Sequence, residues 1–308
     1  MMKVSPLILF ILAGVSTVAF QCNNDFDPKS PDFKERIVVF AVLDASKHTQ
    51  MVRLAKSYDS RTSNPKDFFG SKEITDARII MTNRKYTYTF NDTMITDSEG
   101  KQRKVWVKSG LDMPEAEPFT LRVDASGLDP VSSNVLIPNR MFLYASVFNS
   151  PSTNVRQVEV GSPTGVEAPA KGYLFKLILR GSKITGGNKV TIDKEVPLTV
   201  RMENGQQVSL YPKLGRENVI FFEVSMVIAV REELSKTWLA ENIEAFVIGY
   251  ALDSNLYNYY YTARGFDDPL TVRQDLPDFT NINGGLGVFG SMTADTVGVN
   301  LTELIGPQ

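Results

Sequence analysis

The sequence predicts a mainly β protein, built as two β-sandwich-like domains with one or two short helices in the C-terminal half. Two observations favour this class. Short runs rich in Val, Ile, Thr, Tyr and Phe recur along the chain, with turn-forming residues between them. Several runs also alternate apolar and polar residues, the period-two pattern of a strand with one buried face. Sheets of this kind pair their apolar faces into sandwiches.

The first half of the chain contains a series of predicted strands. The run 37–43 is apolar throughout, which predicts a central strand covered on both faces. The run 86–90 places its aromatic residues on one face and its threonines on the other. Further strands are expected at residues 50–55, 77–82, 104–108 and 119–123.

A dense group of turn-forming residues separates the two halves. Pro, Ser, Asn and Gly cluster between residues 147 and 172, so we place a domain boundary near Ser150. This boundary defines an N-terminal β-sandwich domain, residues 36–150, and a C-terminal β-rich domain, residues 151–308.

The second half combines strands with two helices. Asn204-Gly205 predicts a hairpin turn, because both residues tolerate a positive φ. Apolar residues at helical spacing predict a helix over residues 232–242. Strands are expected at residues 173–179, 196–202, 219–230 and 245–252.

The second helix is expected to begin at Asp253 and Ser254, which are good N-cap residues. Tyr257 and Tyr261 follow at i, i+4 spacing and therefore share a face. Such a face can stack against sugar rings. It can also pack on the sheet of the second domain, as aromatic stripes at helical spacing usually do.

The N-terminus has the three parts of an export signal: Lys3, an apolar run over residues 7–15 and small residues over 14–19. Residues 1–21 are therefore predicted to be a signal peptide. The apolar run is too short for a transmembrane helix, which needs about 20 residues. Cys22 follows directly and is the only cysteine in the chain.

This segment resembles a bacterial lipoprotein signal, in which the cysteine after the apolar run is cut and acylated. The resemblance implies a lipid on Cys22, with residues 22–35 as a lipid-anchored linker. Gln21 departs from the motif, which has a small residue there, so simple secretion with a free thiol at Cys22 stays open. Residues 23–27 resemble the acidic-aromatic tag of Bacteroidota surface lipoproteins. This implies the cell surface of the outer membrane, with the periplasmic face as the alternative.

Composition and motifs argue against several kinds of binding site. Lys and Arg number 33 against 35 Asp and Glu, and no basic tract follows the signal, which argues against a nucleic-acid partner. His48 is the only histidine, so no multi-histidine metal site can form. Residues 285–290 fit GxGxxG but lack the following helix of a dinucleotide site, and they predict a glycine-rich turn into a last strand. No cofactor is expected.

Two short sites are candidates for modification. Asp92-Thr93-Met94 and Asp295-Thr296-Val297 resemble the Asp-Thr-apolar acceptor of Bacteroidota O-glycosylation. The resemblance implies glycans on Thr93 and Thr296, and both would require an exported protein.

The mature chain as a whole is similar to a family of Bacteroidota outer-membrane lipoproteins of unknown function, typically encoded near TonB-dependent receptors. The most specific part is the Asn-Ile-Asn-Gly-Gly block at residues 281–285. The resemblance implies an all-β, two-domain, membrane-tethered accessory protein without established catalytic residues, so none is carried over. The stretches that carry it are residues 36–43, 51–54, 75–79, 118–123 and 279–291.

The leading hypothesis is a non-enzymatic, surface-exposed lipoprotein. It would bind a glycan or peptide ligand, or an outer-membrane receptor partner such as a TonB-dependent receptor. An extracellular glycan or peptide hydrolase that uses a carboxylate pair is the enzymatic alternative. A structural subunit of an envelope complex is the third.

Overall fold

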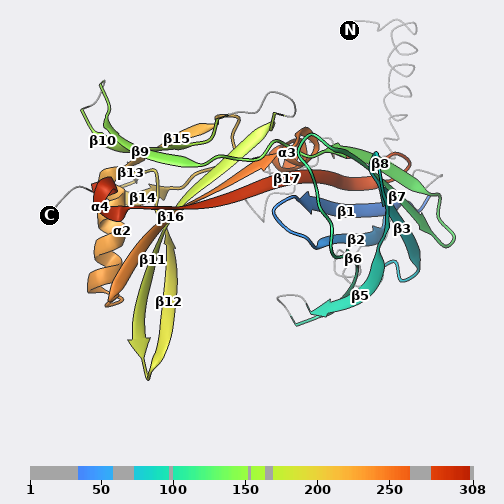
Figure 1. Ribbon diagram of the computed structural model, residues 1–308, viewed down its shortest axis with the longest axis horizontal. Coiled ribbons are helices and arrows are strands. Elements are labelled where there is room, and N and C mark those ends of the chain that lie inside the picture. Colours follow the sequence, from blue (N-terminus) through green and yellow to red (C-terminus); the bar gives the residue numbers. More distant parts are fainter. Residues whose placement is uncertain are drawn as a thin grey trace, which may run out of the picture.

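The computed structural model describes residues 34–57, 73–96, 100–151, 154–163, 169–263 and 279–305. The chain is mainly β, with short helices in its C-terminal half, and this confirms the predicted class. Its strands gather at two ends of an elongated molecule (Figure 1). Cys22 and the predicted signal peptide lie outside the described residues.

One eight-stranded sheet extends through both ends of the molecule (Figure 1). Its strands, in spatial order, are β12 (Asn188–Glu195), β11 (Gly172–Thr185), β16 (Asn242–Leu252), β17 (Leu286–Val299), β1 (Ile37–Asp44), β2 (Gln50–Lys56), β6 (Gln102–Lys108) and β5 (Asn91–Thr96).

Strand β17 joins the two ends because it changes partner along its length. Its first half pairs in parallel with β1, from Val38 opposite Leu286 to Asp44 opposite Met292. From Met292 onward it pairs antiparallel with β16, as far as Val299 opposite Ala245. The pairing partner therefore changes at Met292, which we call the junction.

The N-terminal lobe is a β-sandwich. A second sheet of β4 (Thr87–Thr89), β3 (Ala77–Thr82), β7 (Pro118–Ala125) and β8 (Val131–Leu136) shares a hydrophobic core with β1, β2, β6 and the first half of β17. Trp106 is buried in this core, and its indole N–H donates to the Ala77 carbonyl across the two sheets, at 3.2 Å. Ile282 and Phe289, near the C-terminus, belong to the same core.

The C-terminal lobe has its own core on the other part of the large sheet. Strands β11, β16 and the second half of β17 pack with a three-stranded sheet and two helices. A two-stranded hairpin, β13 and β14, turns at Asn204 and Gly205, whose φ values of 50° and 79° confirm the predicted turn. The elements added here are β9 (Tyr144–Asn149), β10 (Arg156–Gly161), β13 (Thr199–Glu203), β14 (Gln206–Leu210), β15 (Val219–Glu223), α2 (Val224–Lys236) and α4 (Leu301–Ile305).

The predicted boundary near Ser150 lies in the turn that joins β9 to β10, which pair with each other. The chain passes from the first hydrophobic core to the second earlier than this, between Ile137 and Met141. The division into domains 36–150 and 151–308 stays a prediction, and β17 contributes to both cores.

The prediction for residues 219–242 was wrong in part. The strand expected over 219–230 ends at Glu223, and α2 begins at once with Val224 and ends at Lys236. The valines of this run are β-branched and suggested a strand. The buried residues recur at helical spacing and face the C-terminal core, so packing outweighs the local preference. These residues are Val224, Val227, Val230 and Leu234.

Strand β1 is central in its sheet, as predicted, but it is not covered on both faces. Its inward residues are fully buried, whereas Phe40 on the opposite face is 40% exposed. The sequence of residues 37–43 did not predict this difference in exposure between the two faces of β1, because every residue in the run is apolar and suits a buried strand.

The glycine-rich run begins β17, in agreement with the sequence analysis. Gly287 has a φ of +100°, and a Cβ at this position would lie 2.1 Å from the Val39 carbonyl oxygen. Only glycine permits β17 to approach β1 this closely. Gly298, on the same strand, has open space where its Cβ would lie.

We therefore expect Gly287→Ala to lower the free energy of unfolding by on the order of 3 kcal/mol, because it combines an unfavourable φ with a backbone clash. Gly298→Ala is the matched control and should be neutral or slightly stabilising. Urea denaturation of both variants measures the difference. Equal stabilities would show that the approach of β17 to β1 does not depend on Gly287.

Candidate functional site

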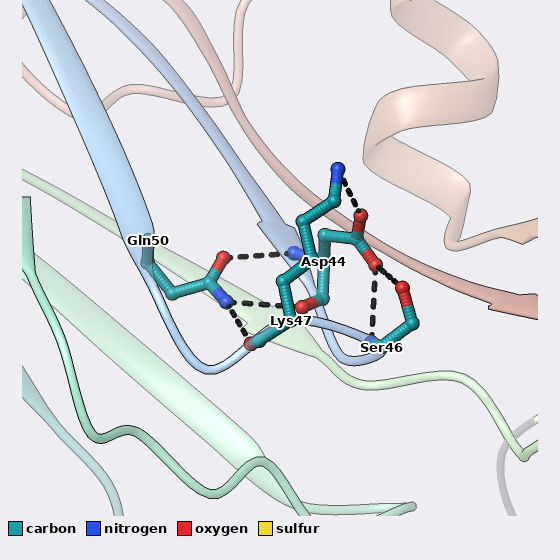
Figure 2. Close-up of polar contacts among 4 residues, drawn as sticks. All are labelled: Asp44, Ser46, Lys47 and Gln50. Carbon is teal, nitrogen blue, oxygen red and sulfur yellow. Dashed lines mark hydrogen bonds and ion pairs between the residues drawn. The ribbon is translucent and has the colours of Figure 1, made fainter. Parts of the chain in front are cut away.

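A polar network of two buried and two exposed residues lies at the end of β1, beside the junction (Figure 2). The Asp44 carboxylate accepts hydrogen bonds from the backbone N–H and the hydroxyl of Ser46, and it pairs with the Lys47 ammonium at 2.9 Å. The Gln50 side chain accepts from the Asp44 N–H at 2.9 Å and donates to the carbonyls of Asp44 and Lys47. Asp44 and Gln50 are both buried, so these bonds supply the partners that buried polar groups require.

This turn is also tied to β17. The Ala45 N–H donates to the Met292 carbonyl at 2.9 Å, at the residue where β17 changes partner. The Asp44 network therefore holds the end of β1 against the junction.

Helix α3 (Ser254–Ala263) begins at the junction and packs on β17 (Figure 1). Asp253 precedes it, and its Oδ1 accepts from the backbone N–H groups of Leu256 at 2.9 Å and Ser291 at 3.0 Å. This confirms Asp253 as a helix-capping residue and shows that the same carboxylate holds the helix on β17. Gly290 lies directly below the helix, because a Cβ there would be 2.7 Å from Leu256 Cβ.

Burial raises the pKa of Asp253 from 3.8 to about 6, against the opposing effect of its backbone hydrogen bonds. A carboxylate with a shifted pKa beside a cavity is a common mark of a functional site. Here the cavity measures about 400 Å³ and is lined from both lobes, by Asn134 and Leu136 of β8 and by Lys171 and Asn255. Asp253 itself is committed to backbone N–H groups, so its clearest role is to orient α3.

The two tyrosines that the sequence placed on one face do lie together, but they differ in exposure. Tyr257 is only 5% exposed, and Gly172 of β11 lies so close that a Cβ there would be 2.1 Å from its ring. Tyr261 is 65% exposed and stacks on Tyr257, with 5.8 Å between the ring centroids. Tyr257 thus packs into the protein, and Tyr261 offers its ring to solvent.

An exposed aromatic surface lies beside α3 on the outer side of β1 and β2. Phe40 and Tyr259 form an edge-to-face pair at 6.4 Å, and Tyr259 contacts Tyr260 in the same way at 5.7 Å. The register places Arg53 opposite Phe40, and Met51 follows on the same face of β2. Phe40, Met51, Arg53 and Tyr260 are all exposed. We call these four residues and Tyr259 the junction face.

Sequence reasoning missed the junction face. The alternation of Met51 and Arg53 with buried neighbours in β2 was a usable signal for an outward face. The pairing of Phe40 with Tyr259 was not predictable in the same way, because it joins residues far apart in the chain.

The two candidate glycosylation sites are exposed and well separated in the large sheet. Thr93 lies on the edge strand β5, next to Asp92, which pairs with Lys104 at 2.9 Å. Thr296 lies on β17, and its N–H donates to the Asp295 carboxylate at 2.9 Å. Their modification stays a prediction.

The described part of the chain contains neither a metal-binding cluster nor a membrane-spanning helix. There, no group of three or more His, Cys, Asp or Glu side chains could hold a metal ion. None of the helices in that part combines the length and the apolar character needed to cross a membrane.

The fold and its junction define a class of two-lobed β-protein, in which a shared C-terminal strand joins a sandwich to a second β-rich lobe. The chain matches the family described as "Domain of unknown function (DUF4249)" over residues 23–297, and it belongs to that family. This confirms the expectation of a family of unknown function. A comparison with curated proteins finds no match.

Asp253→Asn tests the role of the buried carboxylate, because Asn keeps an oxygen for the two N–H groups but cannot ionise. The folded pKa of Asp253, about 6, lies above its unfolded value of 3.8. The stability of the wild type relative to this variant should therefore be highest below pH 4 and fall as the pH rises through 6. The full change is about 3 kcal/mol, of which about 2 kcal/mol falls between pH 4.5 and 7.

Urea denaturation between pH 4.5 and 7 measures this difference. Asp193→Asn is the control, because a hydrogen bond from Arg180 lowers the pKa of Asp193, so its difference from the wild type should be nearly flat in this range. A flat difference for Asp253→Asn as well would contradict the assigned burial of its charge.

Proposed function

We propose that this chain is a non-enzymatic, surface-exposed lipoprotein that binds an outer-membrane receptor partner through the junction face. The observation that carries the proposal is the composition of this face. Tyr, Phe, Met and Arg are the side chains enriched at the centres of protein–protein interfaces, where a few residues provide most of the binding energy.

The buried carboxylates at the junction are occupied by hydrogen bonds within the chain, which favours a binding function over a catalytic one. Asp44 accepts from Ser46 and pairs with Lys47, and Asp253 accepts from backbone N–H groups. Both carboxylates are held as acceptors by their own chain. Groups held in this way keep the shape of the junction, and a fixed shape lowers the entropic cost of binding a partner.

The predicted lipid on Cys22 supports a partner in the same membrane. The linker, residues 22–35, can span at most about 50 Å when fully extended, at about 3.5 Å per residue. It leads directly into β1, the strand that carries Phe40. Confinement to one membrane raises the effective concentration of a tethered protein for its partner. The resemblance to Bacteroidota lipoproteins encoded near TonB-dependent receptors suggests such a receptor as the partner.

Cys22→Ser tests the anchor. The variant should lose both membrane retention and acyl labelling, because serine offers no thiol for the lipid. Fractionation of cells grown with a labelled fatty acid measures both. Retention and labelling equal to the wild type would show that the chain is not anchored through Cys22.

The double variant Phe40→Ala, Tyr260→Ala tests the binding surface. It should lower the affinity for the receptor at least about tenfold, as removal of central aromatic residues does at other interfaces. Native co-purification after detergent extraction, followed by titration of the isolated receptor, measures the change.

Tyr86→Ala serves as the control, because Tyr86 is also an exposed tyrosine but lies beside β4, outside the junction face. Denaturation curves establish that the variants fold. Undiminished capture of the receptor by a folded double variant would exclude the junction face as its binding surface.

A further inference from the structure

A second surface with binding character lies in the C-terminal lobe, between the β13–β14 hairpin, the end of β12 and helix α2. It is a groove of about 680 Å³, within the range of known ligand sites. It lies at the end of the molecule away from β1 and β2 (Figure 1), and it is therefore separate from the junction face.

One wall of the groove is a row of side chains from a single strand and its extension. Gln207, Ser209 and Tyr211 line the groove at alternate positions, so they share one face of the hairpin. Val208 and Leu210, the apolar residues between them, are not part of the lining. Val200, which lies opposite Ser209, is the residue that β13 adds to this wall. The hairpin therefore presents an amide, a hydroxyl and an aromatic ring to the groove, beside one valine.

These three side chains are available to a ligand. None of them has a side-chain hydrogen bond to another residue in the part of the chain that the structure describes, and Tyr211 is 47% exposed. The opposite wall is one stripe of α2, with Met226, Ala229 and Val230 in the lining. The groove therefore combines an apolar side with a row of free polar groups.

The charges of the groove cancel within the protein. Asp193 forms a two-point pair with Arg180, at 2.6 and 2.7 Å. Glu195 pairs with Lys176, and Glu233 pairs with Lys194, both at 2.8 Å. Every carboxylate of the lining thus has its own cation, and a charged ligand would find no uncompensated opposite charge.

From this arrangement we propose that the groove binds a neutral saccharide. A sugar ring has an apolar C–H face that packs on an aromatic ring such as Tyr211, while its hydroxyls need groups that both donate and accept. Gln207 and Ser209 are such groups, and the paired carboxylates keep oxygen lone pairs free to accept. An aliphatic ligand would instead bury these polar groups without partners, at a cost of roughly 1–3 kcal/mol for each.

The experiment uses the full mature protein and an array of neutral oligosaccharides, with calorimetric titration of the saccharide that is retained best. Tyr211→Ala should weaken binding at least tenfold, and Tyr211→Phe should retain most of it because the ring remains. Gln207→Ala should cause a smaller loss. Tyr86→Ala is the control, since it removes an exposed tyrosine outside the groove.

Two outcomes would overturn the proposal: no saccharide bound at millimolar concentration, or a bound saccharide whose affinity is unchanged in folded Tyr211→Ala. Capture of a peptide in this groove without any saccharide would overturn it as well. The result is independent of the receptor proposal. Phe40→Ala, Tyr260→Ala should bind the saccharide normally, and Tyr211→Ala should still co-purify with the receptor.

Discussion

The pairing of β17 with two different strands is the interaction on which the rest of the structure depends. Its first half extends the N-terminal sandwich beside β1, and its second half extends the C-terminal sheet beside β16. Phe289 fills the first core, and Val297 packs against the second. Because this strand contributes to both cores, neither core is complete without it. The absence of a side chain at Gly287 makes the close approach to β1 possible.

Where a strand changes partner, neighbouring backbone N–H and C=O groups lack a partner in the sheet and need other hydrogen bonds. β1 stops at Asp44, and α3 starts after Asp253, both beside the junction at Met292. Their carboxylates, together with Gln50, provide the hydrogen bonds that these buried groups need. The most buried acidic groups of the junction are therefore explained by folding, which leaves the exposed surfaces to carry function.

Two such surfaces arise from different parts of the architecture. The junction face forms where α3 lies beside β1 and β2, and its exposed aromatic residues favour a protein partner. The groove forms where the β13–β14 hairpin stands beside α2, and its cancelled charges favour a neutral polar ligand. Both surfaces lie within residues 23–297, the part of the chain that matches the family.

The sequence by itself determined the features that depend on local geometry. The alternation of apolar and polar residues predicted the β class. Asn204-Gly205 predicted the hairpin turn, and Asp253 predicted the start of α3. Each of these features depends on the conformations of a few adjacent residues. Tertiary structure alone decided the rest. Val224 and Val227 suit a strand or a helix, and only the core they face selects the helix. Helical spacing placed Tyr257 and Tyr261 together, but packing beneath the distant β11 buries one and leaves the other exposed. The junction face likewise forms only because long-range pairing brings α3 to β1. The pattern of neighbouring residues in the sequence does not predict such contacts.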